Sequence, residues 1–182
     1  MQLRNTSTTY GAVSKFFHWL IFLLVLAMLI FGYFLDDVPK EYKAVAYNLH
    51  KLTGLTILLL MLLRLMWALT NSKPLLPAET SCWQRGAERI VHGLLYAALI
   101  GMPLAGWIGA VAGEKPPHLG DFQFNLPIAP SKALKNTAFD IHGYLAITII
   151  VLVSVHALAA LYHHFIKKDN ILKRMLPWVS TQ

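Results

Sequence analysis

Cysteine is almost absent from this chain of 182 residues, because Cys82 is its only one. A single cysteine excludes an internal disulfide, a CxxC redox pair, an all-cysteine iron–sulfur site and a CxxCH motif for covalent cofactor attachment. Any redox cofactor must therefore be held by other side chains.

Charged residues are also scarce. They make up 14% of the chain against 56% hydrophobic residues, a composition that excludes an ordinary soluble globule. Four apolar runs approach the length of about 20 residues that a membrane-spanning helix needs. They predict an all-α membrane protein, a single membrane domain over 1–182 built as an antiparallel bundle of four transmembrane helices. The predicted helices are 14–36, 47–69, 88–112 and 140–166, with an outer loop at 113–139 and an inner amphipathic tail at 167–182.

Acidic residues are the scarcer charges, nine against sixteen Lys and Arg. If both termini lie inside, the inner segments hold ten of the basic residues and three of the acidic ones. The positive-inside rule therefore favours an N-in, C-in orientation. We interpret the net charge of +7 as topology and attraction to membrane lipid, and expect no nucleic acid partner.

Four histidines in or beside the apolar runs fall at two depths. His142 and His156 are fourteen residues apart, which is about 21 Å along a helix, and they share one face at the 3.5-residue repeat of a packed bundle. If the last helix enters from outside, His142 lies near the outer surface and His156 near the inner one. His18 is then level with His156, and His50 is level with His142.

Imidazoles in hydrocarbon are costly unless they pair or coordinate. Any one of these histidines alone is most simply a hydrogen-bonded packing residue. Two depth-matched pairs instead favour two b-type haems stacked across the bilayer, because each iron needs two facing imidazoles and no covalent link. The expected haem-iron ligands are His18 with His156 and His50 with His142. A proton path or another metal path is the alternative.

Cations at two depths could meet the haem propionates. Lys51 on the outside and Arg64 on the inside are placed for this, although snorkelling to lipid headgroups accounts for them equally well. The sequence identifies no catalytic acid, base or nucleophile.

The remaining histidines leave alternatives open. By depth alone, His92 is as good a partner for His156 as His18 is. His163 and His164 lie too near the inner interface for the same iron, so an interfacial or quinone-side role competes with an ordinary surface position.

Four segments together resemble one known family. FFHWLIFLLVLAM, NLHKLTGLTILLLMLLRL, VHGLLYAALIGMPLAGW and the closing IHGYLAITIIVLVSVHALAALYHHFIKKDNILKRMLP are similar to the bacterial cytochrome b561 family. The resemblance implies a dihaem protein of the bacterial inner membrane that exchanges electrons with ubiquinone. It also implies that His18 is the helix-1 ligand, with His92 a neighbour of the inner haem or quinone pocket. The other ligands of the family match His50, His142 and His156.

The resemblance leaves the electron donor open. One class of the family takes an electron from superoxide outside the membrane and passes it to ubiquinone. Related cytochromes instead anchor a separate dehydrogenase or hydrogenase, and this is the alternative function. Our hypothesis is that a periplasmic donor passes electrons to the haem at His50 and His142. The electrons then pass to the haem at His18 and His156, and from there to ubiquinone. Superoxide is the donor that we favour. The outer lysines that could attract an anion are Lys40, Lys43, Lys51, Lys132 and Lys135.

Overall fold

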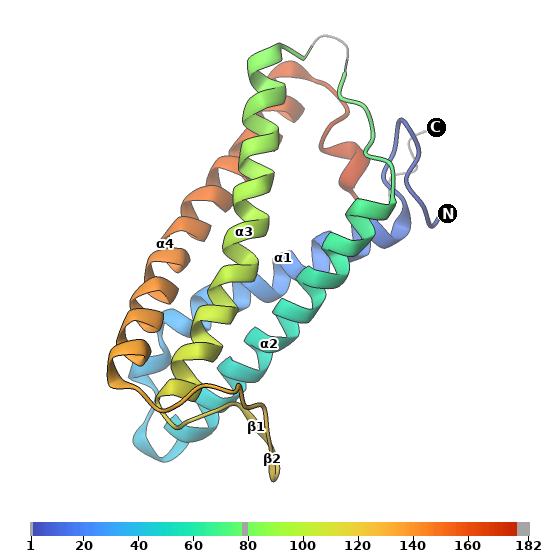
Figure 1. The fold of residues 1–182 in the computed structure, drawn as a ribbon. Coiled ribbons are helices and arrows are strands. Elements are labelled where there is room, and N and C mark those ends of the chain that lie inside the picture. Colours follow the sequence, from blue (N-terminus) through green and yellow to red (C-terminus); the bar gives the residue numbers. More distant parts are fainter. Residues whose placement is uncertain (1, 78–79, 178–182) are drawn as a thin grey trace.

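Four long helices make up most of the protein. The computed structural model describes residues 2–77 and 80–177 (Figure 1). Each helix carries an apolar stretch long enough to cross a membrane, which confirms the predicted all-α, four-helix membrane fold. The helices are α1 (Ala12–Tyr33), α2 (Lys40–Thr70), α3 (Cys82–Ala112) and α4 (Lys132–Tyr162).

Short elements connect and close the bundle. A 3-10 turn, η1 (Leu35–Asp37), joins α1 to α2, and a small antiparallel hairpin pairs β1 (His118–Leu119) with β2 (Phe122–Gln123) between α3 and α4. After α4 the chain continues through a π-helical turn, η2 (His163–Lys167), and a 3-10 turn, η3 (Lys173–Met175). We call the end with both chain termini the terminal end, and the opposite end the hairpin end (Figure 1).

The helices extend beyond the apolar runs. Helix α2 begins at Lys40, whereas hydropathy placed its start at 47, and α4 begins at Lys132 instead of 140. Hydropathy detects only the apolar part of a helix and misses polar first turns. The first turn of α4 is capped by the Ser131 hydroxyl, which accepts a hydrogen bond from Leu134 N at 3.2 Å, and α2 begins directly after Pro39. Lys132 and Lys135 therefore stand on the first turns of α4.

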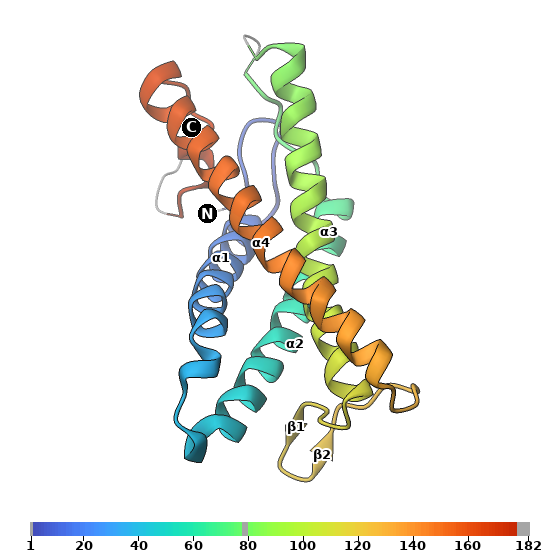
Figure 2. The same cartoon turned by 90° about the vertical axis from the view of Figure 1, so that its left-hand side faces the viewer.

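The core lies along the middle of the bundle. Figure 2 shows α4 crossing in front of α3, with α1 and α2 to the left of α3. The outward faces are apolar, with Tyr144 71% and Leu158 65% exposed, as expected for a surface that contacts lipid. The buried core cluster comprises Ile21, Val25, Ile57, Met61, Ala98 and Ile149.

Hydrogen bonds fasten the chain segments at both ends. At the terminal end, Lys15 Nζ and Trp19 Nε1 donate to the carbonyls of Leu176 and Met175, so the tail is held against the start of α1. At the hairpin end, the Asn48 side chain donates to His118 O at 2.8 Å and accepts from His118 N at 3.0 Å. These bonds hold the tail against α1 at one end and the hairpin against α2 at the other.

Candidate cofactor-binding sites

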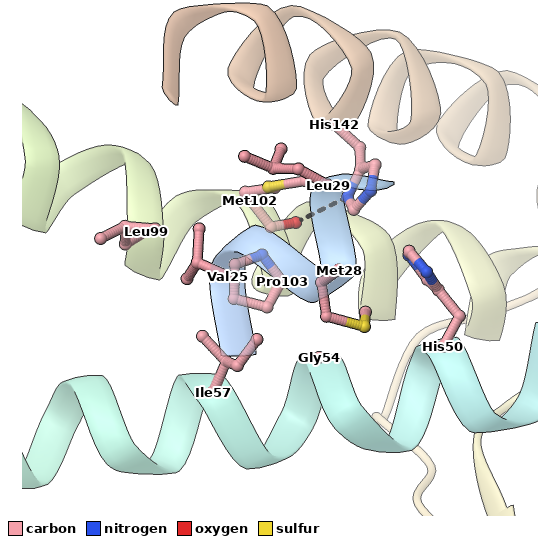
Figure 3. Close-up of a pocket in the computed structure, with 10 residues that line it drawn as sticks. All are labelled: Val25, Met28, Leu29, His50, Gly54, Ile57, Leu99, Met102, Pro103 and His142. Carbon is pink, nitrogen blue, oxygen red and sulfur yellow. Dashed lines mark hydrogen bonds between the residues drawn. The ribbon is translucent and has the colours of Figure 1, made fainter. Parts of the chain in front are cut away.

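His50 and His142 form one facing pair at the hairpin end, which we call the hairpin-end pair. Their ring centroids lie 6.1 Å apart, one ring on α2 and the other on α4. Both rings point into a pocket of about 50 Å³ between the helices (Figure 3). Its other walls are apolar or small residues, Val25, Met28, Leu29, Gly54, Ile57, Leu99, Met102 and Pro103.

The His142 ring is held in a defined tautomer. Its Nδ1 lies 2.9 Å from Met102 O, and a carbonyl only accepts, so Nδ1 carries the proton (Figure 3). Nε2 is then left with a free lone pair. Gly106 permits this approach, since a Cβ there would lie 2.9 Å from His142 Nδ1. A histidine that donates through one nitrogen to a backbone carbonyl is typical of a metal ligand that binds through the other.

His50 faces it from α2 with an unsatisfied nitrogen. Its Nδ1 is buried and has no hydrogen-bond partner among the residues that the structure describes. A Cβ at Gly32 would come within 3.1 Å of His50 Cε1, so this glycine also makes room for a ring. Buried unsatisfied polar atoms are uncommon and often mark a place where a bound group is missing.

His18 and His156 form the second facing pair, the terminal-end pair. Their ring centroids lie 6.2 Å apart, whereas His92 on α3 lies only 5.1 Å from His156. Two imidazole nitrogens on opposite sides of one metal ion, each about 2 Å from it, place the ring centroids about 6 Å apart. Both His18–His156 and the hairpin-end pair fit this spacing, and His92–His156 is too short for it.

Arg64 contacts His18 of the terminal-end pair. Its Nη2 lies 3.2 Å from His18 Nδ1, and its guanidinium stacks over the Tyr96 ring at 5.6 Å. An arginine can only donate, so Nδ1 accepts and the His18 proton is on Nε2. Arg64 must therefore withdraw from Nδ1 before Nε2 can bind a metal, and its charge then becomes available to a carboxylate.

Lys51 and His92 both have protein partners. Lys51 Nζ donates to Lys115 O at 2.9 Å and so holds the loop after α3. His92 Nδ1 lies 2.6 Å from Glu88 Oε1, and the same oxygen contacts Lys73 Nζ at 2.5 Å. Sequence reasoning missed Glu88, although its position four residues before His92 places both side chains on one face of α3.

Tyr10 lies before α1, close to this polar cluster. Burial, and next the nearby Glu88 carboxylate, raise the pKa of Tyr10 above its ordinary value. Its hydroxyl therefore stays protonated at neutral pH and can act as a hydrogen-bond donor.

The other histidines singled out in the sequence lie outside the two pairs. His163 Nδ1 contacts Asp169 Oδ2 at 2.5 Å. The neighbouring His164 has a buried Nδ1 with no hydrogen-bond partner within the described part of the chain. His118 is exposed on β1.

Comparison with known proteins bears on these pairs. The family model described as "Prokaryotic cytochrome b561" matches residues 9–178. "Cytochrome b561 homolog 2" of Escherichia coli (strain K12) is 33% identical over 179 residues, covering 97% of this chain and 95% of that protein. "Cytochrome b561 homolog 1" of the same strain is 31% identical over 175 residues, covering 92% and 97%. "Probable superoxide oxidase CybB" of Yersinia pestis is 29% identical over 178 residues, covering 92% and 96%.

Proposed function

The chain belongs to the prokaryotic cytochrome b561 family, and on that premise we propose that it transfers electrons from a donor outside the cell membrane to ubiquinone through two b-type haems. Membership makes it a membrane electron-transfer protein that binds haem b, and its four apolar helices make it a multi-pass protein of the bacterial inner membrane. The number of haems, the donor and the quinone are the parts that we propose.

Two facing histidine pairs carry the proposal. We propose that His50 and His142 would hold the iron of one haem and His18 and His156 that of the other. The matching centroid distances of 6.1 and 6.2 Å support this assignment, as does the free Nε2 of His142. When bound, haem iron supplies one-electron redox chemistry.

The other residues of the sites would fix and shield these ligands. Met102 O orients His142, while the apolar pocket wall keeps water away from the hairpin-end pair. At the other pair, Arg64 is placed to balance a propionate charge once it leaves His18. Because Lys51 is engaged with a loop carbonyl, we assign the loop contact as its first role and a propionate contact as its second.

We propose that the terminal end faces the cytoplasm. The basic residues of the sequence concentrate in the segments at that end, as the positive-inside rule requires. The hairpin-end pair would then lie on the periplasmic side and the terminal-end pair on the quinone-reducing side.

Superoxide is the donor that we favour. One similar protein bears the name "Probable superoxide oxidase CybB", and a polar pocket of about 360 Å³ opens at the hairpin end. Lys132 and Lys135 line it together with Ser131, Asn136 and Glu114. Lysines beside an opening raise the local concentration of small anions. The pocket lies on the first turns of α4, about two helical turns before His142.

Quinone reduction with superoxide as the sole donor is the deciding assay. The purified haem-loaded protein should form quinol from a ubiquinone analogue during steady superoxide production, and superoxide dismutase should stop it. Replacing both Lys132 and Lys135 with Gln should lower kcat/KM for superoxide, whereas the control Lys173→Gln, in η3 at the terminal end, should not. If quinone reduction is no faster than the uncatalysed background, superoxide is excluded as the donor.

One observation favours the alternative of a cytochrome b subunit that anchors a dehydrogenase or hydrogenase. Leu119 and Phe122 on the hairpin are 68% and 65% exposed at the end of the bundle, where a partner could cover them. Affinity purification from native membranes tests this directly. A stoichiometric redox partner that is lost in a Leu119→Ser, Phe122→Ser variant would support the subunit role.

A further inference from the structure

After α4 the chain reverses direction and brings the Asp169 carboxylate into contact with the His163 imidazole. The last turn widens into the π turn His163–Lys167, and Lys168 adopts a left-handed conformation with φ of 56°. This conformation is uncommon for a residue other than glycine, and π turns inside helices are frequent at functional sites. The reversal lets Asp169 N donate to His163 O at 3.2 Å and brings Asp169 Oδ2 to 2.5 Å from His163 Nδ1.

Both side chains of this contact are largely shielded. Those of His163 and Asp169 are 17% and 21% exposed. The second carboxylate oxygen, Oδ1, accepts a hydrogen bond from Ile171 N at 3.0 Å, so the carboxylate is fixed at both oxygens. An ionised carboxylate only accepts, so the proton lies on His163 Nδ1 and Nε2 has the free lone pair.

The location suits proton transfer at the terminal end. His163 follows His156 by seven residues, at the start of the π turn that continues α4, about 10 Å further toward that end. It is therefore beyond reach of the same iron but close to the terminal-end pair. The tail that carries Asp169 is held against α1 by the Trp19 contact to Met175 O.

We propose that Asp169 is a positioning residue that holds His163 as a proton relay for quinone reduction at the terminal end. The inference rests on the proposed function. Ubiquinone takes up two electrons, one at a time, from two molecules of the outer one-electron donor, and two protons from water at this end. For each proton, His163 Nε2 binds a proton from water and releases it to a quinone oxygen, while the Asp169 carboxylate stabilises the intervening imidazolium. With superoxide as donor, two superoxide ions, one quinone and two protons give two O₂ and one quinol.

A purely structural reading makes Asp169 the cap of the π turn. A cap would affect thermal unfolding, whereas a positioning residue would affect the proton-transfer step. Asp169→Asn keeps the size of the side chain and removes its charge, and Asp169→Glu keeps the charge. Asp121→Asn on the hairpin is the matched control for loss of a carboxylate, and His118→Gln, at an exposed position of β1, is the control for loss of an imidazole.

The experiment measures quinone reduction by the purified haem-loaded protein in H₂O and D₂O. We expect Asp169→Asn to lower kcat about tenfold and His163→Gln about a hundredfold, with less than a twofold change in KM for quinone and a larger solvent isotope effect on kcat. Asp169→Glu should recover most of kcat, and both controls should behave as the wild type.

The outcomes separate the two proposals. A wild-type kcat and isotope effect in Asp169→Asn, or a change in thermal unfolding alone, would overturn the relay while leaving the proposed function intact. A wild-type protein that reduces no quinone with any outer one-electron donor would overturn both.

Discussion

The hairpin-end pair and the terminal-end pair have nearly the same spacing but differ in what surrounds them. At the hairpin end, His142 donates to a backbone carbonyl and has Nε2 free, inside an apolar pocket. At the terminal end, His18 accepts from Arg64, and polar residues of α3 lie beside His156. In the first pair a backbone carbonyl leaves His142 Nε2 free to bind a metal, whereas the second pair requires a charged side chain to move.

The difference matches the tasks that we propose for the two ends. A site that only passes electrons gains from a fixed, dry pocket that excludes water. A site next to a reaction that consumes protons needs polar groups, and these are found at the terminal end in Glu88, His92 and the His163–Asp169 contact. The following predictions test this contrast, from the largest expected effect to the smallest.

Removing a proposed ligand from either pair should stop electron transfer, because the two pairs act in series on the proposed path. We expect His142→Ala and His156→Ala each to lower quinone reduction at least about a hundredfold. Steady-state assays on the purified variants measure this. Full activity in either variant would show that the corresponding pair is not on the path.

Gly106 should matter to the hairpin-end pair alone. In Gly106→Ala the new methyl group would press on His142 Nδ1 and disturb its bond to Met102, so we expect about tenfold weaker haem binding at that site. The control is Gly101→Ala on the same helix, where the methyl group would lie at an ordinary 3.5 Å from Leu145 Cδ1. Haem titration of the apoprotein compares them, and equal affinities would contradict the assigned role of Gly106.

Arg64 should act on the terminal-end pair alone. Arg64→Gln removes a positive charge next to His18, which disfavours the reduced state, so the reduction potential of that site should fall by on the order of 50 mV. A redox titration followed by absorbance should resolve the two haems that we propose. An equal or larger change at the hairpin-end site would contradict the placement of Arg64.

Asn48 should affect stability without affecting either pair. Asn48→Ala removes two hydrogen bonds to the His118 backbone, for a loss of about 1 kcal/mol. Hydrogen exchange should become faster at His118, while the haem spectrum stays unchanged. A spectral change at the hairpin-end site would mean that this contact also positions His50, two residues further along α2.

Much of the fold could be predicted from the sequence, because length and hydropathy identify membrane helices. The four helices follow from the apolar runs, and the pairing of His142 with His50 by depth follows from residue spacing along a regular helix. Helix ends could not be predicted in the same way. The first turns of α2 and α4 are polar, so hydropathy misses them; α2 begins directly after Pro39, and α4 begins at the Ser131 cap.

The details that set the chemistry were less accessible. The tie between His18 and His92 could not be resolved by depth, because it depends on helix rotation and on the distance across the bundle. The Nδ1 contact of His142 depends on a glycine that allows α4 to approach α3. Asp169 reaches His163 only through a π turn and a left-handed Lys168, neither of which has a reliable sequence signal.

The central claim is that α4 gives one ligand to each of two haems. It is tested most directly by counting haem b per chain in purified wild type, His50→Ala and His142→Ala proteins, with reduced-minus-oxidised spectra. We predict two haems in the wild type and one in each variant, with the remaining spectrum the same in both. A single haem in the wild type would contradict the claim. So would the loss of both haems in one of the variants, provided that this variant still unfolds cooperatively.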